Sequence, residues 1–339
     1  MTIGDGVGQQ KVENLEISHI IKDFGISKLV IHGLFPEFAA LINKIPQNVS
    51  IAWFVWGFDI YNQDRVRNTL YATETQKLRG KFRKGGLKRT IKNIPFIKQL
   101  YYKILGTQDY QNNINIAYKR IKYFCSYIED DFLFFDKFYN HSSAFFYAPF
   151  CTIDQYLGGN QDRRMSSVAS NILLGNSNSI ENNHVDVLEK LKGREGGAKI
   201  YIPLSYGNDL EYRNFVIQYG KEKYGEKVVA LTDFMAISDY LNLISGCSVA
   251  IFYHFRQQAM GNIIALLYMG MRVYLSNNNP AYRYCKRIGL NVFDFDNDYI
   301  LYGTAVLEEV LAEENREILR KNFSKEEVAY HLGKLVESL

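Results

Sequence analysis

Short apolar runs that end in polar or glycine-bearing loops recur through the second half of the chain. We predict strands from these runs at residues 171–174, 199–204, 227–231, 249–255, 272–275 and 290–295. Runs of this length, rich in β-branched and aromatic residues and bounded by turn residues, are typical of buried strands. Helical patterns separate them, and a strand–helix alternation of this kind predicts an α/β fold with a doubly wound parallel sheet.

The first half of the chain has a similar but sparser pattern. It predicts a short helix at 15–24 and strands at 28–31, 51–55 and 144–149. From 158 to 170 the composition shifts to Gly, Asn, Gln, Asp, Arg and Ser, which indicates a domain boundary. We therefore predict an N-terminal domain over 1–165, a C-terminal domain over 166–310 and terminal helices over 311–339, since 339 residues suffice for two domains.

Two loops after predicted strands carry residues that suit a diphosphate. The loop after 249–255 contains Arg256 and two glutamines, and a helix is predicted to begin just beyond it. Arginine offers a planar fork to phosphate oxygens, amides offer neutral donors, and helix N-termini attract anions. A plain strand-to-helix turn with a surface arginine is the alternative. With the loop after 171–174, the predicted diphosphate ligands are Asn176, Ser177, Arg256, Gln257, Gln258, Gly261 and Asn262.

Charge is distributed unevenly along the chain. The net charge is only +4, yet residues 75–108 contain basic residues and no acidic one, with apolar positions at three- and four-residue steps. A basic amphipathic stretch suits the surface of an anionic bilayer. A solvated basic face packed on its own domain is the alternative, and without a nucleic-acid module pattern we expect no nucleic acid partner. The predicted membrane-associating residues are Lys84, Lys88, Arg89, Lys92, Lys98 and Lys103.

Other sequence features limit the possible chemistry. The four cysteines lie far apart without the paired spacing of zinc sites, so we interpret them as reduced thiols. The acidic run from Asp294 to Asp298 has Tyr299 and Ala305 where a calcium loop has glycine and glutamate, so we interpret it as a surface turn. Neither an export signal nor an apolar run of about 18 residues is present. We expect no metal, no cofactor and no membrane span.

Five short motifs resemble the bacterial 4-acetamido-4,6-dideoxygalactosyltransferases, over about residues 28 to 295. They are His32-Gly33, Trp56-Gly57-x-Asp59-x-Tyr61, Gly175-Asn176-Ser177 with Asn182 and His184, Pro203 with Tyr206, and Arg256-Gln257-Gln258-x-x-Gly261. The resemblance implies a GT-B fold, in which two Rossmann-like domains face a cleft. It also implies that the donor binds mainly to the C-terminal domain and the acceptor mainly to the N-terminal one.

The resemblance also implies a reaction. This family transfers its sugar from a dTDP donor to an undecaprenyl-diphosphate-linked glycan during enterobacterial common antigen synthesis. We therefore expect a metal-independent hexosyltransferase with a dTDP-sugar donor and a lipid-linked glycan acceptor, peripherally bound at the cytoplasmic face of the bacterial inner membrane. The family has a further strand–helix unit before its His-Gly strand, for which the residues before Lys28 leave little room. Either the chain is truncated or mis-started, or its N-terminal domain is shortened, and the function that this difference affects is acceptor binding.

Sugar transfer requires stabilisation of the leaving diphosphate and, if the configuration inverts, a base. The candidate bases are Asp59, His32 and Asp131, and Asp59 is preferred because it follows a strand directly. Capping the next helix is an equally good role for Asp59. Tyr206, Thr232 and Asp233 are predicted to contact the nucleoside, and His184 to take part in binding. The alternatives are a sugar-nucleotide epimerase of the same fold and a non-catalytic module that docks on membrane or nucleic acid.

Overall fold

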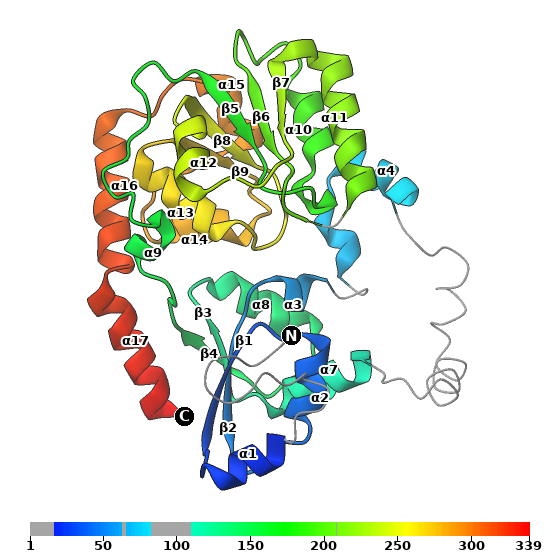
Figure 1. Ribbon diagram of the computed structural model, residues 1–339, viewed down its shortest axis with the longest axis vertical. Coiled ribbons are helices and arrows are strands. Elements are labelled where there is room, and N and C mark those ends of the chain that lie inside the picture. Colours follow the sequence, from blue (N-terminus) through cyan, green and yellow to red (C-terminus); the bar gives the residue numbers. More distant parts are fainter. Residues whose placement is uncertain (1–16, 63–65, 83–109, 208) are drawn as a thin grey trace. The chain divides into compact units, whose positions relative to one another are not determined.

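The computed structural model describes residues 17–62, 66–82, 110–207 and 209–339, which form two compact units (Figure 1). Among the described residues, the first unit contains 17–62, 110–148 and 331–339, and the second contains 66–82 and 149–330. The sequence prediction placed the boundary at 165 instead. Residues 149–165 join the second unit because Ile153 N–H donates to Phe323 O and Met165 N–H to Met269 O.

The first unit is a four-stranded parallel sheet in the order β1-β2-β3-β4. Its core is aromatic: the Trp53 ring is fully buried and lies 5.3 Å from that of Phe124 and 5.5 Å from that of Phe135. Strand β3 was not predicted from the sequence. The elements are α1 (Ile17–Asp23), β1 (Lys28–His32), α2 (Pro36–Ile42), β2 (Ser50–Phe54), α3 (Phe58–Tyr61), α7 (Tyr110–Arg120), β3 (Tyr123–Ser126), α8 (Glu129–Phe138) and β4 (Ala144–Tyr147).

The second unit is a six-stranded parallel sheet in the order β10-β9-β8-β5-β6-β7, which confirms the predicted doubly wound sheet. From β5 the chain builds one side of the sheet through β6 and β7, then crosses back to β8 and builds the other side. The strands are β5 (Asn171–Leu174), β6 (Ile200–Pro203), β7 (Val228–Leu231), β8 (Cys247–Phe252), β9 (Arg272–Leu275) and β10 (Phe293–Asp294).

The second unit begins with residues 66–82, which come before β3 and β4 of the first unit in the chain. Its helices include those of this segment. They are η2 (Arg67–Leu70), α4 (Thr73–Phe82), α9 (Ile153–Leu157), η3 (Ile180–Asn182), α10 (His184–Leu191), α11 (Leu210–Tyr224), η4 (Gly225–Lys227), α12 (Ile237–Ile244), α13 (Met260–Met269), α14 (Pro280–Arg287), α15 (Phe295–Tyr302), α16 (Glu309–Asn322) and α17 (Lys325–Ser338), whose last residues join the first unit. Within the described ranges no helix is sufficiently long and apolar to span a bilayer.

Strand β8 is the central apolar strand, and all six of its residues are buried. A continuous apolar run is what a parallel strand covered on both faces requires. The strand ends at Phe252 rather than at the predicted residue 255, because its partners end there: Ile251 pairs with Leu174, and Phe252 pairs with Leu275. Residues 253–255 therefore belong to the loop, where they can contribute to a site.

The acidic run from Asp294, the last residue of β10, to Asp298 is the start of a helix rather than the surface turn predicted from the sequence. Asp294 is buried and is the N-cap of α15, since its carboxylate accepts a hydrogen bond from Asp296 N–H at 3.3 Å. Asp298 accepts from Asp294 N–H at 2.7 Å. Carboxylates in a first helical turn satisfy free N–H groups and complement the helix dipole, so the fold itself accounts for this cluster.

Candidate active site

The loops after β5 and β8 meet at the point where the strand order of the second unit reverses. Gly175 N–H donates to Ile251 O at 2.9 Å, which places the loops side by side. Beyond it, the Gln258 amide Nε2 lies 2.8 Å from Asn176 Oδ1 and 3.3 Å from Ser177 Oγ. In open α/β sheets ligands bind at this reversal, outside the carboxyl ends of the strands. The structure thus brings together the two loops that the sequence singled out.

The Asn182 side chain fixes the conformation of the loop that follows β5, called the β5 loop below, through hydrogen bonds to Asn176 and Ser177. Its side chain is fully buried, accepts from Asn176 N–H at 3.2 Å, and donates from Nδ2 to Ser177 Oγ at 3.0 Å. Gly175 has φ +71°, and a Cβ there would lie 2.6 Å from His184 Nε2 and 3.0 Å from Asn182 Oδ1. The loop therefore needs glycine for both its backbone angle and its packing.

Helix α13 contributes its N-terminus to the same place. Its N-cap residue, Ala259, has a left-handed backbone with φ 59°, so the chain turns sharply after the glutamines and the helix begins at Met260. The first N–H groups of such a helix are free to bind an anion. Gly261 lies against Tyr156, whose Cδ1 would be 3.4 Å from a Cβ. The side-chain oxygens of Gln257 and Gln258 are buried, and neither has a hydrogen-bond partner within the described ranges.

A pocket of about 250 Å³ opens beside these loops, at the carboxyl ends of β6 and β7. Its apolar walls and few polar groups suit a nucleobase. Of the three predicted nucleoside contacts, Asp233 lines the pocket, whereas Tyr206 and Thr232 do not, and Tyr206 is 75% exposed. Helix α12 supplies part of the wall, which no sequence motif indicated. The lining residues are Asn176, Pro203, Ser205, Leu231, Asp233, Phe234, Met235, Ile237, Tyr240 and Asn262.

Arg256 acts electrostatically on Glu181, a residue of η3 that the sequence motifs did not single out. Burial raises the pKa of Glu181, but the Arg256 guanidinium, a hydrogen bond from Ser179 and Arg67 outweigh burial, and the pKa is lowered. Glu181 is therefore a carboxylate at neutral pH. An anionic side chain next to the predicted phosphate ligand is a feature that only the tertiary structure reveals.

Two buried histidines support the loops. Burial lowers the pKa of both His184 and His254 to about 3, with Arg256 adding to the effect at His254, so both imidazoles are neutral at pH 7. His184 Nδ1 lies 3.1 Å from the Tyr212 hydroxyl, and its ring lies directly behind Gly175. These contacts favour a supporting role for His184 over direct ligand binding, which stays a prediction.

The three candidate bases lie at the carboxyl ends of neighbouring strands of the first unit's sheet: His32 is the last residue of β1, and Asp59 and Asp131 lie in α3 and α8, the helices that follow β2 and β3. Asp59 is 3% exposed, and its Oδ2 accepts from Trp53 Nε1 at 2.9 Å and Leu34 N–H at 3.0 Å. Burial raises its pKa to about 6, although these donors oppose the rise. The contacts favour a role in fixing two neighbouring turns, and the role of base stays a prediction.

The other two candidates differ in their exposure. Asp131 is fully buried, and its Oδ1 accepts from the Tyr61 hydroxyl at 2.8 Å. His32 is exposed at the end of β1 and stacks on Phe54 with ring centroids 4.7 Å apart, and partial burial lowers its pKa. Of the three candidates, His32 is therefore the one that an external hydroxyl can reach directly.

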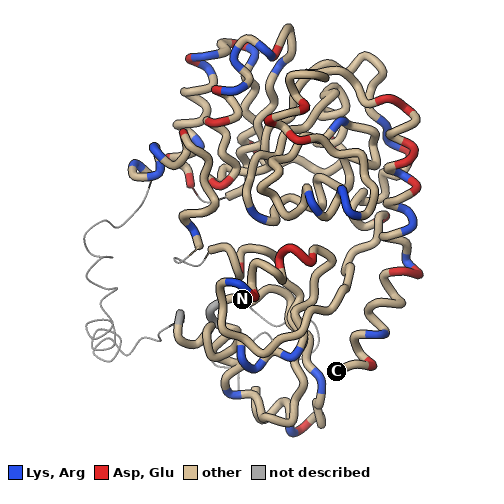
Figure 2. Tube along the Cα trace, turned by 180° about the vertical axis from the view of Figure 1, so that it is seen from behind, with Lys and Arg blue, Asp and Glu red and all other residues tan. Residues whose placement is uncertain are grey.

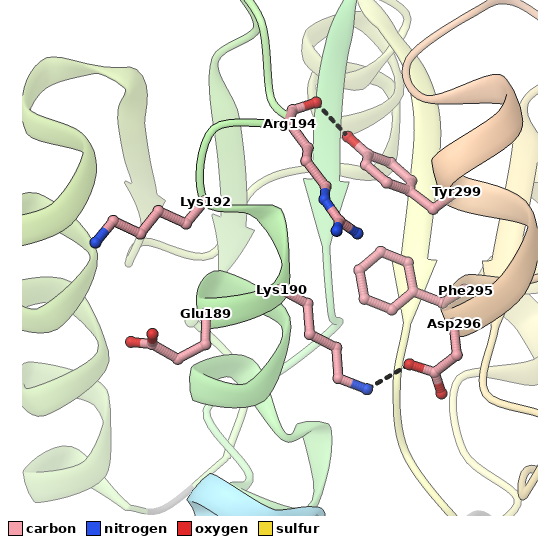
Figure 3. Close-up of a pocket in the computed structure, with 7 residues that line it drawn as sticks. All are labelled: Glu189, Lys190, Lys192, Arg194, Phe295, Asp296 and Tyr299. Atoms are coloured by element: carbon pink, nitrogen blue, oxygen red, sulfur yellow. Dashed lines mark hydrogen bonds and ion pairs between the residues drawn. The ribbon is translucent and has the colours of Figure 1, made fainter.

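A different pocket of the second unit, of about 230 Å³, lies between α10 and α15 (Figure 3). The charged side chains that line it bind other side chains of the protein: Lys190 pairs with Asp296 and donates to the Tyr253 hydroxyl, and Glu189 pairs with Lys223. Within the described ranges no cluster of three or more metal-ligating side chains occurs. The predicted membrane-associating residues Lys84, Lys88, Arg89, Lys92, Lys98 and Lys103 lie outside the described residues.

Known proteins match this chain at two levels. A family model described as 4-alpha-L-fucosyltransferase, glycosyl transferase group 56, matches residues 96–330. Solved structures of similar fold include a sucrose-phosphate synthase from Thermosynechococcus elongatus (TM-score 0.58, 8% identity, covering 95% of this chain and 76% of that one). A glycosyltransferase from Rickettsia africae matches with a TM-score of 0.56 and 15% identity, covering 95% of this chain and 78% of that one. HepE from Anabaena, solved with UDP and glucose, matches with a TM-score of 0.52 and 11% identity, covering 93% of this chain and 100% of that one. These likenesses confirm the predicted GT-B-like α/β fold with two parallel sheets.

Proposed function

The chain belongs to the group 56 glycosyltransferases, and we propose that its donor is a dTDP-linked 4-acetamido-4,6-dideoxyhexose and its acceptor a glycan on undecaprenyl diphosphate. Family membership makes the chain a hexosyltransferase and favours transfer over the epimerase and docking-module alternatives. The sugar and the acceptor come from the motif resemblance. The nucleotide rests in addition on the geometry of the second unit.

The observation that carries the proposal is the bridge from Gln258 to Asn176 and Ser177. It joins the two loops where a diphosphate would meet amide donors and the N-terminus of α13. Asn176 and Asn262 also line the adjacent pocket, so a nucleoside in that pocket would extend its phosphates toward the bridge. The Anabaena neighbour, solved with UDP and glucose, is consistent with a nucleotide ligand.

In the proposed reaction the protein itself stabilises the leaving diphosphate. The donor's anomeric C–O bond breaks, and the negative charge that develops on the diphosphate meets Arg256, the loop amides and the dipole of α13. The acceptor hydroxyl attacks the anomeric carbon and gives up its proton. Of the candidate bases, His32 is exposed, and its lowered pKa keeps the imidazole neutral and able to accept that proton.

We further propose a peripheral location at the cytoplasmic face of the inner membrane. A lipid-linked acceptor presents its glycan at a bilayer surface, and the basic stretch in residues 75–108 is the part of the sequence suited to such a surface.

The nucleotide is tested by thermal shift with dTDP, UDP and GDP on the wild type and on Arg256→Ala. We expect dTDP to stabilise the wild type most, and the variant to lose at least about 2 kcal/mol of transition-state stabilisation in transfer assays with the dTDP-sugar. Arg194→Ala, at an exposed arginine away from the two loops, serves as control. An absence of response to all three nucleotides would contradict the nucleotide site, and near-wild-type turnover would remove Arg256 from this role.

A further inference from the structure

The second unit contains a further cavity, of about 760 Å³, to which the proposed reaction assigns no ligand. It is about three times as large as the pocket assigned to the nucleoside. Its walls are residues 71–77 at the start of α4, one side of α10, the loop that follows β8 (the β8 loop) and the loop that follows β9. All of these segments belong to the second unit.

The strand order places this cavity on the opposite side of the diphosphate loops from the nucleoside. In the order β10-β9-β8-β5-β6-β7, the nucleoside pocket lies at the ends of β6 and β7, and the cavity borders the loops after β8 and β9. Phe255, which lines the cavity, directly precedes Arg256 in the β8 loop. The cavity therefore adjoins the loop predicted to bind the diphosphate.

The start of α4 is a fixed wall of the cavity. Asp186 of α10 accepts from Glu74 N–H at 2.7 Å and from Thr75 N–H at 2.9 Å. Just before the helix, the Tyr71 hydroxyl donates to Glu181 at 3.2 Å. Because hydrogen bonds from two carboxylates attach this wall to the rest of the unit, the cavity is formed before a ligand binds, which lowers the ordering cost of binding.

The charged side chains of the lining disfavour an anionic ligand. Three carboxylates line the cavity, but only two lysines do, Lys77 and Lys190. Lys77 pairs with Glu74 at 2.7 Å, and Lys190 pairs with Asp296. A phosphate would therefore meet net negative charge and lysines that are already paired. A ligand that suits this cavity is uncharged and polar.

Aromatic rings and amides provide the remaining contacts. The rings are those of Tyr71, Tyr253 and Phe255. An aromatic ring can pack against the C–H face of a sugar, while carboxylates and amides bind its hydroxyl groups. The exposed side chains of Gln76 and Asn278 have no hydrogen-bond partner among the described residues. Each amide can both donate to and accept from the acetamido group of a sugar.

We propose that this cavity binds an oligosaccharide that carries acetamido groups, and that this oligosaccharide is the acceptor glycan. The second part of the inference rests on the proposed function. The volume leaves room for more than one sugar unit, since it is about three times that of the nucleoside pocket. Part of the acceptor then binds to the second unit, whereas the motif resemblance implies that it binds mainly to the N-terminal domain.

An NMR titration of the full chain with N,N′-diacetylchitobiose tests the ligand. Cellobiose is the matched control, because it has the same linkage but hydroxyl groups in place of the acetamido groups. We expect diacetylchitobiose to bind at least about fivefold more tightly than cellobiose, since only its acetamido groups can pair with both amides. Absence of diacetylchitobiose binding would overturn the inference, and equal affinity for the two disaccharides would refute the acetamido preference.

The double variant Gln76→Ala, Asn278→Ala tests the location. It should bind diacetylchitobiose about tenfold more weakly than wild type, because two hydrogen-bonding amides are lost. Gln218→Ala, which removes an exposed amide on α11 outside the cavity, should bind as wild type does. An unchanged thermal shift with dTDP shows that the double variant is folded. Equal binding by wild type and double variant would overturn the inference.

Transfer from the dTDP-sugar to diacetylchitobiose on undecaprenyl diphosphate tests the role as acceptor. The double variant should raise the KM for this acceptor about tenfold and leave the KM for the donor unchanged. A rise in the donor KM alone, or no transfer by a wild type that binds the free disaccharide and transfers its sugar to another lipid-linked glycan, would refute the acceptor role. A wild type that binds diacetylchitobiose but neither binds dTDP nor uses the dTDP-sugar would instead refute the proposed function and support the cavity as a sugar site.

Discussion

At the scale of single residues, the shape of the loop after β5 depends on buried side chains that pack against it. Gly175 leaves room for the ring of His184, and Asn182 fixes the turn that follows. Both partners are fully buried, so the loop cannot relax into solvent when its packing changes. The shape of the loop after β5 is therefore set by the buried side chains of Asn182 and His184 that pack against it.

Gly175→Ala should destabilise the fold by more than the same substitution at a comparable glycine elsewhere. A left-handed backbone costs alanine about 1–2 kcal/mol, and the predicted contact of 2.6 Å with His184 Nε2 adds about 1–3 kcal/mol of overpacking. The matched control is Gly193→Ala, where φ is +75° but no atom lies within 4 Å of the new Cβ. Urea unfolding measures both, and equal losses would contradict the steric contribution at Gly175.

Asp59 should make the stability of the fold depend on pH. Burial raises its pKa from 3.8 to about 6, so the folded state binds the proton more tightly than the unfolded state does. The associated stability is complete below pH 3.8 and is lost as pH rises toward 6. Relative to Asp59→Asn, the wild type should lose about 2 kcal/mol of unfolding free energy between pH 4 and pH 7.

Urea unfolding at several pH values provides this comparison, with Asp154→Asn at an exposed carboxylate as control. A difference between wild type and Asp59→Asn that does not change with pH would contradict the raised pKa.

The Asp59→Asn variant also tests Asp59 as the catalytic base in a sugar-transfer assay. Full transfer by the variant would exclude Asp59 as the base, whereas donor binding without transfer would support that role.

At the scale of elements, the first turn of helix α4 is hydrogen-bonded to a carboxylate on another helix. Asp186 of α10 accepts from Glu74 N–H at 2.7 Å, from Thr75 N–H at 2.9 Å and from the Thr75 hydroxyl at 2.6 Å. These N–H groups belong to the first turn of α4, which lacks intrahelical partners for them. At the other end, the Phe82 ring lies 5.4 Å from that of Tyr212 on α11. The helix is thus capped by one neighbour and packed on another.

Asp186→Ala should loosen α4 selectively. Loss of a cap that serves two N–H groups and a buried hydroxyl should cost about 1–3 kcal/mol, and the amides of α4 should exchange hydrogen faster. Asp209→Ala removes the cap of α11, where the carboxylate accepts from Tyr212 N–H at 3.0 Å, and should leave exchange in α4 unchanged. Equal protection of α4 in wild type and Asp186→Ala would show that packing alone holds the helix.

At the scale of the whole molecule, basic and acidic residues are interspersed along the described chain (Figure 2). On α16, for example, the exposed Arg320 pairs with Glu313 at 2.9 Å. The basic residues at the start of the cationic stretch also have local partners, since Lys77 pairs with Glu74 and Arg79 donates to Asn68. The residues predicted to meet a membrane lie farther along the stretch: Lys84, Lys88, Arg89, Lys92, Lys98 and Lys103.

Replacement of Lys84, Lys88 and Arg89 by glutamine should weaken binding to anionic vesicles. Each basic residue near such a surface contributes about 1 kcal/mol, so the triple variant should bind at least tenfold more weakly in a sedimentation assay. The matched control replaces Lys77, Arg79 and Lys81, which removes the same charge from α4, and should bind nearly as well as wild type. Equal binding by all three proteins, or binding to zwitterionic vesicles, would contradict the membrane prediction.

The sequence by itself determined most strands of the second unit and the loops that follow β5 and β8, because burial between two layers of helices leaves continuous apolar runs that end at polar loops. It did not determine β3, the end of β8 or the helix α15 that Asp294 caps, because strand pairing and caps decide these boundaries. Only the tertiary structure brought the two loops together, attached α4 to α10 and placed Glu181 under the influence of Arg256. Such contacts join residues distant in the chain, and no local pattern of hydrophobic and polar positions records them.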